Sequence, residues 1–242
     1  MKKYSIVVYS HSSYSDAWKI ILGQIDKYFP QEVNRYIFSD SFPLDLSESY
    51  NKIKYLNENA YNKRVLSCLD KVKEDYCIFH QEDMPLYSKP DLQFLDQTVE
   101  LMEKDNIDYV KLIKGGNLGC EEKSYKDFKN LFYMPKNGDC YYSNQPSLCR
   151  TKSLKKLFSM CDAEKIHDFE PKAHKMSLIL DYKNLYSYNN EPKRGMFHWD
   201  SKVYPYVATA IVKGKWNYSE YNHELQKLHK EYKIDPNIRG LA

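Results

Sequence analysis

The chain begins with short apolar runs separated by amphipathic stretches. Residues 4–9 are rich in β-forming side chains, residues 10–15 form a polar loop, and from Asp16 onward apolar residues recur at helical spacing. Further strands are expected at residues 35–38, 53–56 and 108–113. The apolar run 76–79 belongs to another strand, which is expected to end at residues 81–83. Further helices are expected from Ala60 to Val72 and from Pro90 onward. Because strands that alternate with helices usually pair in parallel, the pattern predicts an α/β fold with a mainly parallel, mixed sheet flanked by helices.

The second half of the chain has a less regular pattern. We expect short strands or a hairpin at residues 132–134 and 141–142, an extended segment at 147–150, and helices at about 152–160, from Lys172, and at about 219–232. The last of these is amphipathic and charged, and we expect it to pack on the outside. No linker rich in Ser, Gly or Pro and no internal repeat interrupts the sequence, so a single domain over residues 1–242 is expected.

Composition narrows the class of protein. The 242 residues carry 36 Lys and Arg against 33 Asp and Glu, and the net charge of +3 is too small to indicate a nucleic-acid partner. No apolar run approaches the roughly 18 residues of a membrane span, and the first apolar run is too short for a signal-peptide core. Six cysteines without a CxxC pair favour reduced thiols. We therefore expect a cytoplasmic protein with no transmembrane segment.

Two adjacent carboxylates, Glu82 and Asp83, follow the apolar run 76–79 and precede Pro85. Ligands of open α/β sheets bind outside the carboxyl ends of the strands, so these side chains are placed for chemistry with a bound cation or substrate. The alternative is an ordinary helix N-cap or a solvated acidic pair.

Five short motifs, taken in order, resemble those of the GT-A fold glycosyltransferases, and in particular a group of bacterial and viral sugar transferases with a Gln-Glu-Asp motif at a strand end. They are Tyr14-Ser15-Asp16-Ala17-Trp18, Phe38-Ser39-Asp40, Gln81-Glu82-Asp83-Met84, Ser143-Asn144-Gln145-Pro146-Ser147 and His167-Asp168-Phe169-Glu170. The resemblance implies a nucleotide-binding half over residues 1–115 and an acceptor half with a C-terminal helix over residues 116–242.

The resemblance also implies a divalent metal, Mn²⁺ or Mg²⁺, which neutralises the donor diphosphate as a Lewis acid. Asp83 is then the expected metal ligand, while Gln81 stands where an acid is usual and, with Glu82, is expected to face the nucleotide-sugar. His198 is expected as a second, distant ligand, with Asp200 as a weaker substitute. The alternative for His198 is packing among aromatic side chains.

Transfer with inversion needs a base that takes the proton of the acceptor hydroxyl. By resemblance Glu170, expected just before a helix, fills that role, with Asp168 in reserve. The alternative for both acids is helix capping.

The nucleotide is expected to meet the polar loop after the first strand, the end of the second strand and the helix before the acidic motif. The residues concerned are Ser10, His11, Ser12, Asp40 and Arg64. Each of them is alternatively a solvated loop or helix residue. The segment Lys213-Gly214-Lys215-Trp216 is either a basic clamp for phosphate or a simple hairpin turn.

The resemblance predicts a metal-dependent transferase that moves a hexose from a nucleotide-sugar, with a UDP-sugar favoured, to a glycan or other hydroxyl acceptor. A non-catalytic carbohydrate-binding protein and a sugar nucleotidyltransferase are the alternatives, although Ser10-His11-Ser12-Ser13 lacks the glycines expected of the latter. The absence of G-x-G-x-x-G and of G-x-x-x-x-G-K-[ST] argues against a Rossmann dehydrogenase and a Walker-type NTPase. The donor sugar, the acceptor, the stereochemistry of transfer and the oligomeric state stay open.

Overall fold

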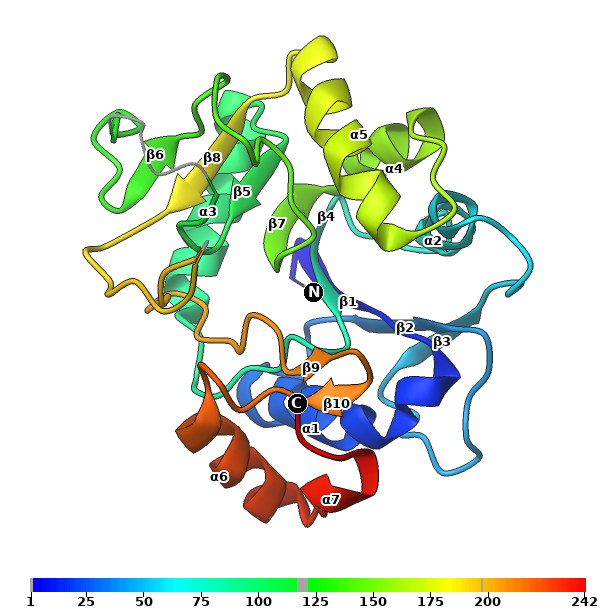
Figure 1. Ribbon diagram of the computed structural model, residues 1–242. Coiled ribbons are helices and arrows are strands. Elements are labelled where there is room, and N and C mark those ends of the chain that lie inside the picture. Colours follow the sequence, from blue (N-terminus) through cyan, green and yellow to red (C-terminus); the bar gives the residue numbers. More distant parts are fainter. Residues whose placement is uncertain (1, 117–121, 197) are drawn as a thin grey trace.

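An eight-stranded mixed sheet forms the centre of the molecule (Figure 1). A computed structural model describes residues 2–116, 122–196 and 198–242. The strand order is β3-β2-β1-β4-β7-β5-β8-β6, and the strands are β1 Tyr4–Tyr9, β2 Arg35–Ser39, β3 Asn51–Lys54, β4 Tyr76–Gln81, β5 Tyr109–Lys111, β6 Leu131–Tyr133, β7 Ser147–Arg150 and β8 Asn184–Ser187. β7 runs antiparallel to β4 and β5, and β6 runs antiparallel to β8, while the other pairs are parallel. The expected α/β fold with a mainly parallel mixed sheet is therefore confirmed.

The helices cover both faces of this sheet. They are α1 Ser15–Tyr28, α2 Tyr61–Leu69, α3 Leu92–Asp105, α4 Thr151–Met160, α5 Ile166–Ile179, α6 Asn222–Tyr232 and α7 Pro236–Arg239, with a 3-10 turn at Ser12–Tyr14. Alternate residues of β1 enter two separate cores: Ile6 and Val8 pack with residues of α1, α3 and α6, whereas Val7 and Tyr9 pack with residues of α2, α4 and α5. This two-sided burial explains why the strands read as continuous apolar runs.

A small hairpin lies apart from the main sheet, beside α1 and α7 (Figure 1). Its strands are β9 Ile211–Val212 and β10 Lys215–Trp216, joined by Lys213 and Gly214. Both turn residues have positive φ, 49° and 78°, which is the backbone of a type I′ hairpin turn. The backbone of residues 213–216 therefore forms the hairpin turn that the sequence offered as one of two alternatives.

Several sequence-based boundaries were wrong. The helix expected from Lys172 begins at Ile166, and the third strand ends at Lys54 rather than Leu56. Tyr141 and Tyr142 lie in an irregular segment and are buried, with the Tyr142 ring packed between Tyr109 of β5 and Phe169 of α5. The last long helix begins at Asn222 rather than near Ser219.

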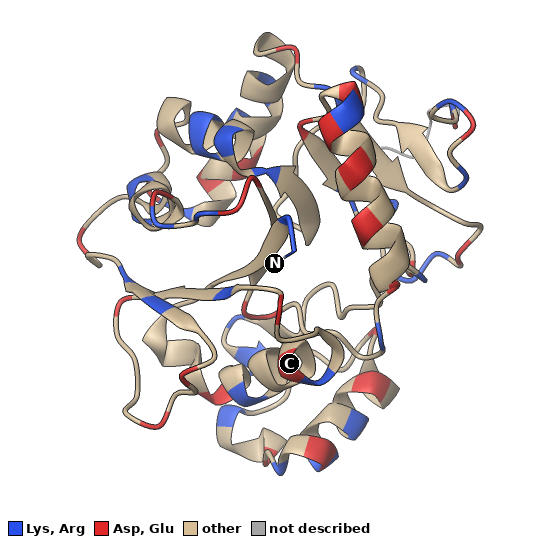
Figure 2. Cartoon of the chain, turned by 180° about the vertical axis from the view of Figure 1, so that it is seen from behind, with Lys and Arg blue, Asp and Glu red and all other residues tan. Residues whose placement is uncertain are grey.

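The surface carries charges of both signs. Figure 2 shows Lys and Arg interspersed with Asp and Glu along the helices seen from behind, consistent with the small net charge. None of the helices in the described part of the chain has the length and apolar character needed to span a bilayer.

Candidate active site

A cavity of about 630 Å³ opens at the edge of the sheet where β4 ends. It is lined by Tyr14, Gln81, Glu82, Asp83, Met84, Asn144, Ile166, His167, Glu170, Thr209, Ile211, Val212 and Lys213. The lining comes from five parts of the chain: the turn before α1, the end of β4, the segment before β7, the first turns of α5, and the hairpin with Thr209 just before it. The strand-end motif and Glu170 therefore share one space.

The backbone around Glu82 and Asp83 is held on both sides. β4 is buried along its whole length, and the chain turns after Gln81, whose carbonyl accepts a hydrogen bond from the Met84 amide at 3.3 Å. The Asp83 carbonyl accepts from the Ala210 amide at 2.8 Å. These bonds leave the two carboxylates to line the cavity. The next helix, α3, is capped by Asp91, so neither Glu82 nor Asp83 is a helix N-cap.

The two carboxylates have no ion-pair partner among the residues that the structure describes. Burial is the main cause that raises the pKa of Glu82 to about 8, and the neighbouring charge of Asp83 raises it further, while Arg239 acts in the opposite direction. Burial likewise raises the pKa of Asp83 to about 7. Two adjacent carboxylates that form no ion pair with a described side chain are suited to a divalent ion or to a substrate that supplies positive charge.

Glu170 belongs to α5 itself, because this helix begins six residues earlier than the sequence suggested. Its Oε1 accepts a hydrogen bond from the Asn144 amide at 3.1 Å, which connects α5 to the segment before β7. α5 starts after Lys165 without a side-chain cap, so the capping alternative describes neither Glu170 nor Asp168. Asp168 is exposed and is not part of the cavity lining. His167 does line the cavity, although the sequence did not single it out as a candidate.

A second polar cluster lies at the ends of β1, β2 and β3. Asp40 accepts hydrogen bonds from the Ser12 amide at 2.7 Å and from the Ser12 hydroxyl at 2.8 Å. Burial opposes the ionisation of Asp40. The hydrogen bonds from Ser12 and the charge of His11, whose Nε2 lies 3.8 Å from Asp40 Oδ2, outweigh this effect and lower the pKa of Asp40. Ser10 is fully buried: its hydroxyl accepts from Trp18 Nε1 at 2.7 Å, and it supports the loop from inside.

Arg64 joins this cluster from α2. Its Nε donates to the Asn59 carbonyl at 2.6 Å, and a terminal nitrogen donates to the Asn57 carbonyl. Asn57 in turn lies 3.3 Å from His11 Nε2. Burial raises the pKa of Tyr9. The charge of Arg64 lowers this pKa and the charge of Glu82 raises it, so Tyr9 lies within electrostatic reach of both the polar cluster and the cavity. His11, Ser12, Asp40 and Arg64 are thus gathered at the ends of β1, β2 and β3, whereas the buried Ser10 faces the interior. None of these expected nucleotide-binding residues is part of the cavity lining.

His198 lies elsewhere. Its Nε2 is 3.1 Å from the Tyr221 hydroxyl and 3.5 Å from Glu220, its ring stacks on Tyr221, and burial lowers its pKa. It packs against Gly195, where a Cβ atom would lie 2.4 Å from the imidazole. His198 is not part of the cavity lining, and the charges that act on it come from residues other than Asp83. The structure does not bring these two expected metal ligands together.

Asp200 is also engaged away from the cavity, in an ion pair with Arg194 at 3.0 Å. Within the described ranges no group of three or more His, Cys, Asp or Glu residues is arranged to hold a metal ion. A cation bound by Glu82 and Asp83 would therefore need oxygen ligands from the substrate or from water.

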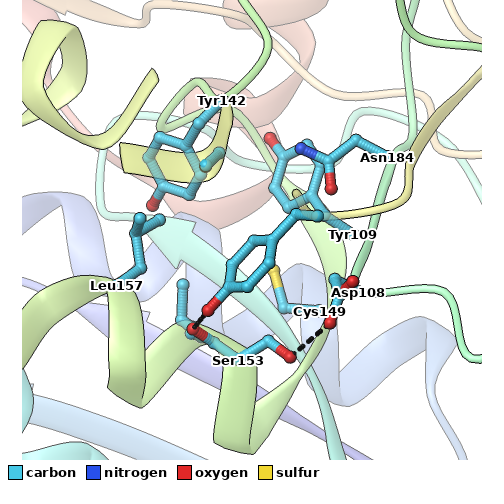
Figure 3. A pocket seen from close by; sticks show the side chains of 10 residues that line it. Asp108, Tyr109, Tyr142, Cys149, Ser153, Leu157 and Asn184 are labelled. Atoms are coloured by element: carbon cyan, nitrogen blue, oxygen red, sulfur yellow. Dashed lines mark hydrogen bonds between the residues drawn. The ribbon is translucent and has the colours of Figure 1, made fainter. Parts of the chain in front are cut away.

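A second internal space, lined by residues of β5, β7, α4, α5 and β8, is too small to be a ligand site. Figure 3 shows this space, where the Ser153 hydroxyl donates to Asp108 at 2.6 Å and the Tyr182 hydroxyl donates to the Ser153 carbonyl at 2.8 Å. Its volume of about 10 Å³ holds one water molecule at most.

The sheet order, the helices on both faces and the cavity at the end of β4 define a GT-A-like glycosyltransferase fold. Among solved structures, the chain is similar to Staphylococcus aureus TarS. It matches the 1–349 fragment of TarS in complex with UDP with a TM-score of 0.53 and 15% identity, covering 82% of this chain and 60% of that one. It also matches the complex with UDP-GlcNAc, with a TM-score of 0.51 and 16% identity over 84% of this chain and 59% of that one. The chain thus spans about three fifths of the TarS fragment.

At 15–16% identity, this likeness concerns the fold. No known family profile matches the sequence, and no curated protein matches it in sequence.

Proposed function

We propose that the protein is a glycosyltransferase that moves a sugar from a nucleotide-sugar, with a UDP-sugar favoured, to a hydroxyl group of a glycan or another acceptor. The observation that carries this proposal is the cavity in which Glu82, Asp83 and Glu170 converge at the end of β4. The TarS complexes with UDP and UDP-GlcNAc support a nucleotide-sugar as the donor class. A cavity of about 630 Å³ is also in the range of small-molecule sites.

The donor nucleotide would bind across the ends of β1 and β2. In this proposal His11, Ser12, Asp40 and Arg64 meet the base and ribose. They are gathered at that edge: Ser12 is hydrogen-bonded to Asp40, and both His11 and Arg64 are hydrogen-bonded to Asn57. Gln81 lines the cavity and is only 4% exposed, and its side chain is hydrogen-bonded to the buried Tyr61. In this proposal Gln81 faces the donor sugar or the ribose.

A divalent cation, Mn²⁺ or Mg²⁺, fits the pair Glu82 and Asp83, whose hard oxygen atoms form no ion pair with a described Lys or Arg side chain. When bound, it would supply Lewis-acid stabilisation of the diphosphate that leaves as the glycosidic bond breaks. Asp83 is the proposed ligand, and Glu82 supports it or faces the donor sugar. The positions of His198 and Asp200 give no support to either of them as a further ligand.

Glu170 is the proposed base for transfer with inversion. It would accept the proton of the acceptor hydroxyl while that oxygen attacks the anomeric carbon. The hydrogen bond from the Asn144 amide to Oε1 fixes the Glu170 carboxylate. The second oxygen, Oε2, has no hydrogen bond from another described residue. The exposed position of Asp168 makes it the weaker candidate for the same role.

Calorimetric titration with UDP, GDP and CMP, and with UDP-GlcNAc, each with and without Mn²⁺, tests this function. We expect binding of at least one nucleotide, with a preference for UDP, and slow release of the nucleotide from its sugar in the presence of acceptor hydroxyls. If the unsubstituted protein binds none of these ligands, the proposal is wrong. Binding of a nucleotide-sugar without any turnover would favour the non-catalytic alternative, and turnover of a nucleoside triphosphate with a sugar phosphate would favour the nucleotidyltransferase.

A further inference from the structure

One guanidinium, that of Arg239 in α7, joins three separate parts of the chain beside the cavity. Its Nε donates to Asp16 at 2.8 Å and one terminal nitrogen donates to the other oxygen of Asp16, at the start of α1. The second terminal nitrogen donates to the Gly214 carbonyl at 3.1 Å, in the turn of the hairpin. A further bond of 3.2 Å reaches the Ser13 carbonyl, in the loop after β1.

Aromatic rings complete this arrangement. The guanidinium carbon lies 4.9 Å from the ring centre of Tyr14 and 5.8 Å from that of Trp216. Trp216 is 1% exposed, and its amide donates to the Gly240 carbonyl at 2.9 Å. Arg239 makes four hydrogen bonds, two to the Asp16 carboxylate and two to carbonyls, which is more than the three N–H donors of a lysine can make. Arg239 therefore ties α7 to the two segments that contribute Tyr14 and Lys213 to the cavity lining.

The hairpin that Arg239 holds places Lys213 on the cavity lining with Glu82 and Asp83. Lys213 is exposed and adopts a left-handed backbone with φ of 49°. Asn or Gly suits this first central position of a type I′ turn better than Lys does. The lysine thus occupies a position that its backbone preference does not explain, and its charged side chain lies at the rim of a cavity that also contains two unpaired carboxylates.

We propose that Arg239 is a positioning residue that fixes the hairpin turn against the loop after β1 and so sets Lys213 as a ligand for the diphosphate of the donor. The inference rests on the proposed function, because it takes a nucleoside diphosphate as the ligand. Lys213 contacts the phosphate in this arrangement, whereas Arg239 acts through Lys213. The Coulombic attraction between Arg239 and Glu82 agrees with the placement of the guanidinium near the same cavity.

Calorimetric titration with UDP and with uridine tests this inference, because only UDP carries phosphate. Lys213→Asn keeps a residue suited to the turn and removes the charge, and we expect it to weaken UDP binding by about threefold to tenfold, the range of a partly exposed charge-assisted contact, without changing uridine binding. Lys215→Asn is the matched control: Lys215 is exposed in the same hairpin but is not part of the cavity lining, so UDP binding should be unchanged.

Arg239→Met should weaken UDP binding as much as Lys213→Asn does. The double variant should bind UDP no more weakly than either single variant, since both remove one contact. Arg239→Lys retains the charge but cannot reach Asp16 and both carbonyls, so it should not restore UDP binding. Arg35→Met controls for a general loss of stability, because Arg35 donates to the Phe29 and Pro30 carbonyls at the opposite end of the sheet.

Four outcomes overturn the inference. UDP binding unchanged in Arg239→Met, full restoration by Arg239→Lys, or equal weakening of UDP and uridine would each show that Arg239 does not act through Lys213. If Lys213→Asn alone leaves UDP binding unchanged, the diphosphate contact is wrong. In all four cases the unsubstituted protein still binds UDP and the proposed function stands, whereas no UDP binding by the unsubstituted protein would overturn both.

Discussion

The carboxyl groups of Glu82 and Asp83 lie unpaired at the end of a buried strand, and this arrangement costs stability. The pKa of Asp83 in the folded chain is about 7, above the value of about 4 expected in the unfolded chain, so the folded state binds this proton more tightly. Below about pH 4 both states are protonated and the effect vanishes. As pH rises from about 4 to 7 the folded state loses stability, and above pH 7 the loss is complete.

Asp83→Asn should therefore be more stable than the unsubstituted protein at pH 8 and similar to it near pH 4. We expect a rise in Tm of about 2–4 °C for each kcal/mol of repulsion and desolvation removed. Thermal unfolding followed by circular dichroism at a series of pH values measures this. A variant that is less stable at pH 8 would contradict the description of these carboxylates as unpaired.

The variant Glu170→Gln tests the proposed role of this single residue as the base. The amide oxygen of Gln can still accept from the Asn144 amide, so the side chain should keep its position. We expect kcat to fall by about 10²- to 10⁴-fold while UDP binding is unchanged, because only the proton acceptor is lost. Asp168→Asn, in the same helix but outside the cavity lining, is the control and should retain activity. Normal turnover of Glu170→Gln would refute the assignment.

At the scale of elements, the sequence predicted the central strands and α1 well because their apolar runs and helical spacing are local properties. The start of α5 was not predicted. Pro171 lies within this helix, and a proline in a helical pattern ordinarily marks a helix start or a break. The packing of Phe169 outweighs that preference: it is fully buried, and its ring stacks on Phe158 with 4.0 Å between the centres.

Phe169→Ala should test how far this packing holds Glu170 in the cavity. Truncation of a buried Phe usually costs about 3–5 kcal/mol, and here it would also loosen the turn of α5 that carries Glu170. We expect a decrease of that size in the free energy of unfolding in urea, together with a lower kcat under conditions where the variant is folded. Ile179→Ala, at an exposed position of the same helix, should change neither. A stable and fully active Phe169→Ala would mean that other contacts fix α5.

At the scale of the whole molecule, the sequence motifs singled out Glu82, Asp83 and Glu170, which line one cavity, but not the contacts between distant segments around that cavity. Asp16 and Arg239 are 223 positions apart, and no local pattern connects them. The same holds for the Asn144 amide, which reaches Glu170 only because β7 is inserted antiparallel between β4 and β5. The surroundings of His198 could not be predicted for a related reason: a histidine within an aromatic motif has the same sequence whether it binds a metal or stacks on Tyr221.

Ligand binding should stabilise the entire fold, because the proposed site takes residues from both ends of the chain. At a UDP concentration 100 times the Kd, linkage gives about 2.7 kcal/mol, which corresponds to a rise in Tm of about 5–11 °C in a chain of this size. Differential scanning fluorimetry with UDP and Mn²⁺ measures this rise, and it should be smaller for Asp83→Asn. No rise at saturating UDP would contradict binding to the folded protein.

The pair formed by Asp16 and Arg239 also bears on the order of folding. Closing so long a loop is entropically costly, so the contact can form only after the sheet has brought both segments near each other. During synthesis, β1, β2 and β4 leave the ribosome long before residue 239 and can begin to pack. The rim of the cavity would then be the last region to form, and a refolding chain should recover its helical signal before it recovers the ability to bind a nucleotide.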